Sequence, residues 1–196
     1  MKIDEFDLDK DILIIAEIGN NHEGSYTLAQ ELIGLAAEAG VDVVKFQTII
    51  PERLVSVQQT DRIKQLKRFQ LSFDEFSKLS EVAKKEGVIF LSTPFDINSA
   101  LFLNDIVPAF KIASGDNDFY PLIEVISKTG KPIIMSTGLM NLDEINKSVL
   151  FINNIWKENQ IKQELALLHC VSSYPTLPEQ ANLLSIRELK KVLFGT

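Results

Sequence analysis

Apolar runs and amphipathic stretches alternate along the chain and predict a regular series of strands and helices. The apolar runs predict buried strands over 12–19, 41–47, 88–93, 109–114, 131–138 and 164–173. The stretches between them repeat apolar residues at helical spacing and predict helices over 25–40, 72–87, 97–105, 119–130, 141–156 and 182–195. Residues 50–70 are predicted to form a longer polar connection with room for one short helix.

Six strand–helix units in a row predict an α/β fold, because strict alternation implies a parallel sheet. A doubly wound sheet and a (β/α) barrel both satisfy this order. No G-x-G-x-x-G turn follows the first strand and no G-x-x-x-x-G-K-[ST] loop occurs, which weakens the doubly wound nucleotide-binding alternative. A closed barrel has eight units and typically ~250 residues, so the chain is either part of a barrel or not a barrel.

The composition narrows the class of protein. The 196 residues suit a single core, with 45% apolar and 24% charged residues. A net charge of −7, without a basic stretch interleaved with aromatics, argues against nucleic-acid binding. No apolar run approaches the ~20 residues that span a bilayer, and the acidic N-terminus lacks a signal-peptide pattern. With Cys170 as the lone cysteine, we expect a cytoplasmic protein that binds no membrane.

Each predicted strand turns polar at its carboxyl end, where parallel α/β folds place their sites. These polar side chains are Glu17, Asn20, Asn21, His22, Lys45, Gln47, Ser92, Thr93, Asp96, Lys111, Ser114, Asp116, Ser136, Thr137, His169, Ser172, Ser173 and Tyr174. One polar strand end is ordinary, because strands leave the core there. Six such ends with two lysines, a glutamate and several hydroxyls predict one shared polar site.

Lys45 and Lys111 are unusual because each interrupts an apolar strand. Side chains alternate along a strand, so Lys45 shares a face with Val43 and Gln47, whereas Phe46 belongs to the face that packs on helices. A single lysine at a strand end is more often ion-paired or solvated. Two lysines among hydroxyls and small-residue turns instead suit an anion with several oxygens. Lysine binds phosphate as a point charge, so a ligand carrying phosphate and carboxylate is predicted.

Six motifs follow one another along the chain: IIAEIGNNHEG, VDVVKFQT, FLSTPFD, FKIASGD, IIMSTGL and LLHCVSSYP. Together they resemble the sialic acid synthase (N-acetylneuraminate synthase) family. The resemblance implies a (β/α)₈ TIM-type barrel followed by a small antifreeze-like domain. Only about six βα units are present, so residues 1–196 are expected to be an incomplete barrel domain, without the antifreeze-like domain and inactive alone.

The resemblance also implies roles for the residues at matching positions. Phosphoenolpyruvate would be bound by Lys45, Thr93, Lys111, Ser114, Ser136, Ser172 and Tyr174. Glu17 and Gln47 would be catalytic groups beside the sugar and the reacting carbons, with Glu17 positioning or deprotonating water or a sugar hydroxyl. Asp116 stands where the family often has glutamate, one methylene longer, so its role stays open.

The implied reaction condenses phosphoenolpyruvate with N-acetylmannosamine or a related N-acetylated amino sugar, giving a nonulosonic (sialic-type) acid and phosphate. A divalent metal, Mn²⁺ or Mg²⁺, is expected to polarise the sugar aldehyde in the complete enzyme. The resemblance implies that its two histidine ligands lie beyond residue 196. Of the histidines present, His22 is expected to be a loop or helix-start residue, and His169, which lacks metal-ligand spacing, is expected to be a packing residue. The full-length protein is expected to be a homodimer.

Two alternative functions remain open at this point. A class I aldolase would use Lys45 or Lys111 as the nucleophile that forms a Schiff base with a carbonyl substrate. A non-catalytic fragment would only bind an anion or a partner chain. Within the synthase reading, the sequence does not choose among sialic, legionaminic and pseudaminic acid precursors.

Overall fold

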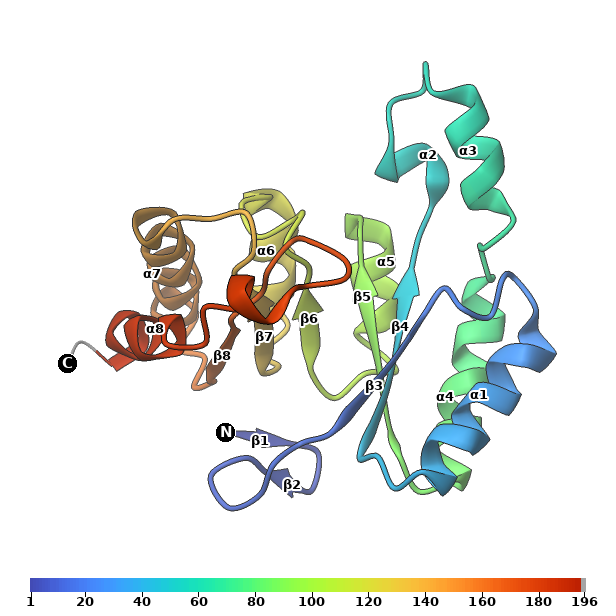
Figure 1. The fold of residues 1–196 in the computed structure, drawn as a ribbon, viewed down its shortest axis with the longest axis horizontal. Coiled ribbons are helices and arrows are strands. Elements are labelled where there is room, and N and C mark those ends of the chain that lie inside the picture. The colour runs from blue at the N-terminus through green and yellow to red at the C-terminus, as the bar shows by residue number, and fades with distance from the viewer. Residues whose placement is uncertain (195–196) are drawn as a thin grey trace. The chain divides into compact units, whose positions relative to one another are not determined.

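The computed structural model describes residues 1–194, and the chain divides into two compact units. Unit 1 comprises residues 1–110 and unit 2 begins at Lys111. Each unit contains a three-stranded parallel sheet, with strand orders β3-β4-β5 and β6-β7-β8 (Figure 1). The prediction of an α/β fold with parallel strands is therefore confirmed, while closure into a barrel stays a prediction.

Unit 1 begins with a short antiparallel hairpin and continues as three βα steps. Its strands are β1 (Lys2–Ile3), β2 (Phe6–Asp7), β3 (Ile15–Gly19), β4 (Val43–Thr48) and β5 (Ile89–Pro94). Its helices are α1 (Tyr26–Glu38), α2 (Pro51–Leu54), α3 (Thr60–Lys67), α4 (Phe73–Lys85) and α5 (Ile97–Leu103). Helices α1 and α4 pack side by side, and α2 and α3 lie beyond the arrowhead of β4 (Figure 1).

Local sequence signals explain where the long helices of unit 1 begin and end. Ser25 caps α1 by accepting from the Leu28 N–H, and Ser72 and Glu75 form a reciprocal capping box at the start of α4. Two residues after each helix ends, Gly40 and Gly87 adopt φ of +82° and +76°, which glycine tolerates without a steric cost. The predicted helices over 25–40 and 72–87 are thus confirmed.

The core of unit 1 shows the predicted alternation along β4. Phe46 lies among aromatic rings, 5.5 Å from Phe90 of β5 and 6.3 Å from Phe76 of α4, measured between ring centroids. All three phenylalanines are buried. Because neighbouring side chains on a strand point to opposite faces, Lys45 projects from the face away from α4. The helix-facing and site-facing sides of this strand were therefore readable from its sequence.

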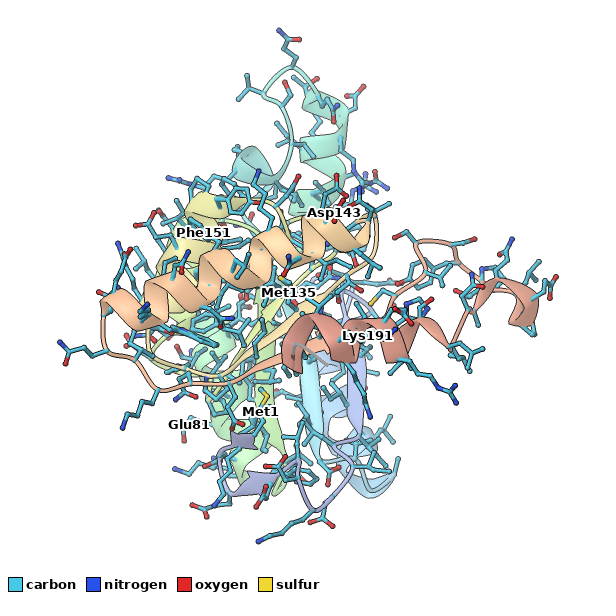
Figure 2. The ribbon with its side chains drawn as sticks, turned by 90° about the vertical axis from the view of Figure 1, so that its left-hand side faces the viewer. Met1, Glu81, Met135, Asp143, Phe151 and Lys191 are labelled. Atoms are coloured by element: carbon cyan, nitrogen blue, oxygen red, sulfur yellow. The ribbon has the colours of Figure 1, made fainter. Side chains whose placement is uncertain are left out.

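Unit 2 continues the βα order. Its strands are β6 (Phe110–Ile112), which begins at the last residue of unit 1, β7 (Ile133–Ser136) and β8 (Leu165–Leu168). Its helices are α6 (Tyr120–Lys128), α7 (Leu142–Glu158), the 3₁₀ turn η1 (Pro178–Gln180) and α8 (Ser185–Phe194). Figure 2 shows α7, which carries Asp143 and Phe151, beside α8, which carries Lys191. The Trp156 indole of α7 donates to the Ser127 carbonyl of α6 at 3.1 Å.

The structure differs from the sequence-based expectations in four places. The last predicted strand, 164–173, is confined to β8, because residues 169–173 form no strand. The acidic N-terminus, expected to be a solvated start, forms the β1–β2 hairpin and buries Met1 and Ile3. The first strand of the parallel sheet begins at Ile15 rather than at residue 12, because Ile12 is exposed. Residues 50–70 hold two helices instead of one. Residue 195, the last of the final predicted helix, lies outside the described residues, and no helix within 1–194 is long and apolar enough to cross a membrane.

Candidate functional site

In unit 1, the three strands of the sheet bring three predicted site residues together. Lys45 on β4 is 4% exposed, and its ammonium lies 2.7 Å from the Glu17 carboxylate on β3. It donates to the Thr93 hydroxyl on β5 at 3.2 Å. Because the strands are parallel and in register, their carboxyl ends meet and the three side chains share one neighbourhood.

Gln47 is held by a neighbour that the sequence did not single out as catalytic or substrate-binding. The Asn20 side-chain amide donates to the Gln47 Oε1 at 2.7 Å. With its oxygen occupied, Gln47 presents its amide N–H groups as donors for a substrate oxygen. Asn20 therefore positions Gln47. The sequence indicates such a role only through the place of Asn20, directly after the first strand and two residues before His22.

His22 is buried against the site-bearing strand and is part of the core of unit 1. Its ring is 0% exposed, and its centroid lies 5.9 Å from that of Phe46. Nδ1 accepts from the Gly24 N–H at 3.1 Å, while Nε2 has no partner among residues 1–194. Burial lowers the pKa of His22, with the Glu75 charge opposing the shift, so the ring is neutral at pH 7.

In unit 2, Lys111 repeats the arrangement found around Lys45. Its side chain is 6% exposed, and its ammonium donates to the Ser136 hydroxyl at 2.5 Å and to the Ile112 carbonyl at 2.9 Å. Lys111 belongs to β6 and Ser136 to β7, so a buried lysine again donates to a hydroxyl on the following strand. The same pairing, of Lys45 with Thr93, occurs independently in unit 1.

Two further predicted serines meet at the backbone of Gly138. A Cβ atom placed on this glycine would lie 2.7 Å from the Ser114 Oγ and 2.8 Å from the Ser172 Oγ. Because Gly138 has no side chain, both hydroxyls can approach the backbone at this position, two residues after Ser136. Ser114, Ser136 and Ser172 are called the serine cluster below.

Tyr174 does not join the serine cluster. Its side chain is 96% exposed, and a side chain this exposed has little contact with the rest of unit 2. The Tyr174–Pro175 peptide bond is cis, within the irregular segment between β8 and η1. The predicted substrate-binding role of Tyr174 therefore has no support from the geometry and stays a prediction.

A buried asparagine that sequence reasoning missed holds the loop after β7. The Asn117 amide donates to the carbonyls of Ser136, at 3.1 Å, and Gly138, at 2.9 Å. The Asn117 backbone carbonyl in turn accepts from the Ser148 hydroxyl of α7 at 2.9 Å. Asn117 is 3% exposed and Ser148 is fully buried. The polar Ser148 within the apolar face of a predicted helix was the one signal for this brace.

Asp116, whose role the sequence left open, has an unusual carboxyl group. Burial raises its pKa from about 3.8 to about 6, and the charge of Asp118 adds to the shift. Its Oδ2 atom is buried without a hydrogen-bond partner among residues 1–194. Near neutral pH the Asp116 carboxyl is therefore easier to protonate than that of an ordinary aspartate. Asp116 stands two residues after Ser114.

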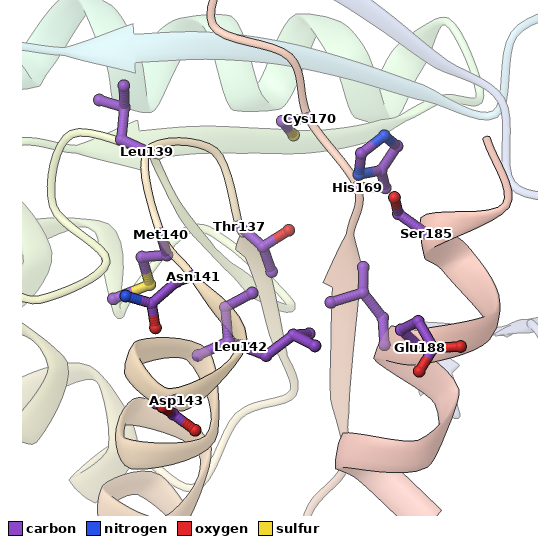
Figure 3. A pocket seen from close by; sticks show the side chains of 12 residues that line it. Thr137, Leu139, Met140, Asn141, Leu142, Asp143, His169, Cys170, Ser185 and Glu188 are labelled. Carbon is purple, nitrogen blue, oxygen red and sulfur yellow. The ribbon is translucent and has the colours of Figure 1, made fainter. Parts of the chain in front are cut away.

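Unit 2 also contains a pocket of about 690 Å³ near the amino end of α7 and α8. Figure 3 shows Thr137, His169, Ser185 and Glu188 around it. None of the residues predicted to bind substrate lines this pocket. The His169 Nε2 lies 2.8 Å from the Ala181 carbonyl, a contact consistent with the packing role expected for this histidine.

The described side chains do not form a site suited to a metal ion. No group of three or more His, Cys, Asp or Glu side chains within residues 1–194 is placed to hold one. Buried His22 has only its Nε2 unengaged, and His169 contacts a backbone carbonyl. The metal expected from the family resemblance would need other ligands.

The fold and the site together define an α/β protein with parallel sheets, in which buried lysines and hydroxyls lie at the strand ends. The NeuB family model matches residues 32–195, so the chain belongs to the NeuB family. The resemblance to sialic acid synthases is thereby confirmed. The crystal structure of the N-acetylneuraminic acid (sialic acid) synthetase from Leptospira borgpetersenii, solved in complex with citrate, is similar, with a TM-score of 0.83 and 35% identity. The match covers 92% of this chain and 61% of that one.

Several curated relatives, though not all, carry sugar-acid synthase names. The N,N'-diacetyllegionaminic acid synthase of Campylobacter jejuni is 37% identical over 195 residues, covering 92% of this chain and 58% of the relative. The Methanocaldococcus jannaschii protein MJ1065 is 44% identical over 180 residues, covering 91% of this chain and 52% of that protein. The chain thus spans about half the length of the curated relatives it matches.

Proposed function

We propose that this chain supplies the phosphoenolpyruvate-binding part of a nonulosonic acid synthase. The complete protein would condense phosphoenolpyruvate with an N-acetylated amino sugar and release phosphate. One observation carries the proposal: in each unit a buried strand-end lysine donates to a hydroxyl on the next strand, Lys45 to Thr93 and Lys111 to Ser136. Buried cations among hydroxyls suit a phosphate and a carboxylate.

In the proposed reaction, C3 of phosphoenolpyruvate attacks the aldehyde carbon of the open-chain sugar. Water adds at C2, and phosphate leaves from C2 by C–O cleavage, giving a 2-keto acid. Lys45 and Lys111 would stabilise the negative charges of the carboxylate and phosphate as they shift. Glu17, already in contact with Lys45, would orient or deprotonate the attacking water or a sugar hydroxyl.

The serine cluster and Gln47 would supply neutral donors in the proposed reaction. Hydroxyls can rotate to donate to phosphate oxygens without adding charge, and Ser136 already accepts from Lys111. The amide N–H groups of Gln47 would donate to the sugar. For the complete protein we also propose a homodimer, as the family resemblance implies. We propose from its net charge and hydropathy that it binds neither nucleic acid nor membrane.

A Schiff-base aldolase is the competing enzyme function. An amine must lose its proton before it attacks a carbonyl, and the Glu17 carboxylate at 2.7 Å suits a Lys45 that acts as a cation. Treatment with pyruvate and borohydride distinguishes the two functions. We expect no covalent adduct on either lysine, and an adduct on Lys45 or Lys111 identified by mass spectrometry would favour the aldolase.

The proposed synthase reaction is tested by phosphate release. The protein, at the full length of its relatives, is mixed with phosphoenolpyruvate, Mn²⁺ and N-acetylmannosamine, or with the acetylated precursors of legionaminic and pseudaminic acid. Lys45→Gln and Lys111→Gln are each expected to lower kcat/KM for phosphoenolpyruvate by about 10²-fold or more. Lys162→Gln, which removes an exposed lysine, is the matched control and should leave the rate unchanged.

The outcomes separate the proposals. Phosphate release that requires one sugar identifies the substrate. Full activity in both Lys45→Gln and Lys111→Gln would contradict the assigned anion-binding roles. The absence of phosphate release with every sugar would reject sugar-acid synthesis from these precursors.

A further inference from the structure

One face of helix α7 in unit 2 is exposed along its whole length. The buried residues of the helix lie on the opposite face: Ile145, Ser148, Val149, Ile152, Ile155 and Trp156. The exposed residues follow one line along the helix: Asp143, Asn146, Lys147, Leu150, Asn153, Asn154 and Lys157. They recur every three or four residues, so a helix of 3.6 residues per turn brings them onto one side (Figure 2). These seven residues are called the α7 stripe.

The α7 stripe borders an open groove of about 690 Å³ at the point where α6 meets α7. Tyr120 of α6 and Phe151 of α7 supply its aromatic side, with ring centroids 4.8 Å apart. Five members of the stripe line the rest of the groove: Asp143, Asn146, Lys147, Leu150 and Asn154. Leu150 is 52% exposed. The stripe therefore converges on one hollow, in which an exposed leucine lies near two aromatic rings.

The charges of the α7 stripe are complementary to those of a second copy. Leu150 lies at the centre, with Asp143 seven residues before it and Lys157 seven residues after it. Spacing by seven residues keeps all three on one side of the helix, as in the seam of a coiled coil. If two copies of α7 meet antiparallel with their Leu150 residues opposite each other, each Asp143 faces the Lys157 of the other copy. A single two-fold axis thus generates two ion pairs.

Both charged ends of the α7 stripe are free to make such ion pairs. Within residues 1–194, the side chains of Asp143 and Lys157 form no ion pair. Lys147 stands four residues after Asp143, a spacing at which helical ion pairs form, yet its ammonium lies over the Tyr120 ring, 5.5 Å from the centroid. Each end of the stripe therefore carries one charge that an antiparallel copy can neutralise.

We propose that the α7 stripe is an interface between two copies of this chain, which meet antiparallel about a two-fold axis at Leu150. Asn146 and Lys147 of one copy then face Asn153 and Asn154 of the other, and these amides set the register because a buried amide needs a polar partner. The apolar contact is small, so the Kd of the pairing is expected to be about 10⁻⁵–10⁻⁴ M, typical of interfaces below about 1,200 Å². The inference does not depend on the proposed reaction, which uses no residue of α7.

A cysteine at the two-fold axis tests the pairing, because a residue on the axis meets its own copy within reach of a disulfide bond. The lone cysteine is removed by Cys170→Ser, and Leu150→Cys is added. Leu35→Cys in the same background is the matched control, since it replaces a 61% exposed leucine within α1. Under mild oxidation, Leu150→Cys should form a disulfide-linked dimer about tenfold faster than Leu35→Cys, or more. Equal rates overturn the proposal.

Charge reversal tests the antiparallel register. Asp143→Lys and Lys157→Asp each place like charges opposite each other, so each should raise the Kd of self-association, measured by sedimentation equilibrium at low salt, about fivefold. The two substitutions change the net charge in opposite directions, so a general charge effect cannot weaken both. Together they restore opposite charges and should return the Kd to within about twofold of the unaltered chain. A double variant that associates no better than the single variants overturns the proposal.

Melting temperatures establish that each variant folds, because reversed charges at the helix ends oppose the helix dipole. The rate of cross-linking reports only on pairing at residue 150, so a homodimer formed through other residues of the complete protein does not produce the same result. The proposed reaction is measured separately by phosphate release, in which no residue of the α7 stripe has an assigned role. The interface can therefore be rejected while the proposed function stands, and the reverse also holds.

Discussion

The positions of the two buried lysines are evident from the sequence, but the residues that they contact are determined by the tertiary structure. A charge removed from water is costly unless it is paired or hydrogen-bonded. Lys45 meets the Glu17 carboxylate, 28 residues earlier in the chain, and Lys111 donates to Ser136, 25 residues later. Both lysines could be singled out in the sequence because they interrupt apolar strands. Their partners depend on which strands pair, which alternation alone does not specify.

At Gly138, the structure predicts a steric effect. Gly138→Ala should destabilise unit 2 by about 1–3 kcal/mol, because the new methyl group would overlap the Ser114 and Ser172 hydroxyls. Urea unfolding measures this change. Adding Ser114→Ala should recover part of the stability without restoring phosphoenolpyruvate binding. Gly115→Ala, where a Cβ would meet nothing within 4 Å, is the control, and a loss there as large as that at Gly138 would contradict the steric explanation.

At Asp116, the structure predicts a pH effect. The folded pKa of about 6 exceeds the ordinary 3.8, so the folded state binds the proton more tightly than the unfolded state. The resulting stabilisation is complete below pH 3.8 and is lost as the pH rises through 6. Asp116→Asn should therefore raise stability at pH 7, on the order of 1 kcal/mol after solvent screening of a partly buried group, and flatten this part of the profile.

Urea unfolding between pH 4 and 7.5 tests the Asp116 prediction. Asp143→Asn, which alters an exposed carboxylate at the start of α7, is the control and should keep the pH dependence of the unaltered protein. An unchanged profile in Asp116→Asn would show that this carboxyl does not titrate differently in the folded state.

At the scale of elements, the helices were predictable because their signals are local. Caps such as Ser72 with Glu75, and glycines that follow a helix end, act within a few residues of one another. Strands of two residues carry no periodicity, so the β1–β2 hairpin was missed. Helices α2 and α3 were merged into one connection because the exposed surface of α3 leaves only a weak apolar pattern.

The brace between α7 and the loop after β7 gives a prediction at this scale. Asn117→Ala should cost about 2–4 kcal/mol, because it leaves the buried carbonyls of Ser136 and Gly138 without donors. Asn117→Asp keeps the size but replaces the donor, and should be equally harmful at neutral pH. Asn146→Ala, on the exposed side of α7, should change stability by less than about 0.5 kcal/mol.

Thermal unfolding with and without phosphoenolpyruvate measures what Asn117 contributes to stability and to phosphoenolpyruvate binding. If the brace positions the serine cluster, Asn117→Ala should also weaken phosphoenolpyruvate binding at temperatures where the variant is fully folded. A variant that unfolds earlier but binds normally would show that Asn117 stabilises the loop without positioning the site.

At the scale of the whole molecule, charge is distributed unevenly. The chain is acidic overall, yet positive side chains gather in residues 51–68, and two lysines are buried at the strand ends. Net charge argues against a general polyanion binder but carries no information about this local concentration. Ion pairing with acidic side chains determines which of these positive charges remain available to bind an anion, and it depends on the folded structure.

Ligand binding should be visible in global stability. At a phosphoenolpyruvate concentration about 100-fold above its Kd, binding stabilises the folded protein by about 2.7 kcal/mol. For a chain of this size the melting temperature should rise by roughly 5–10 °C. Lys111→Gln should lose most of this shift and Lys162→Gln should keep it. An equal shift in both variants would exclude Lys111 from the binding site.

The sequence by itself determined the order of strands and helices, the parallel character of the sheets and the end of each strand at which polar residues collect. These properties depend on alternation, helical spacing and capping, all of which act over short distances. Only the tertiary structure decided that Lys45 meets Glu17 and Thr93, that Asn117 bridges to Ser148, and that Tyr174 stays outside the serine cluster. These contacts join residues far apart in the chain, and their geometry follows from strand register and loop packing.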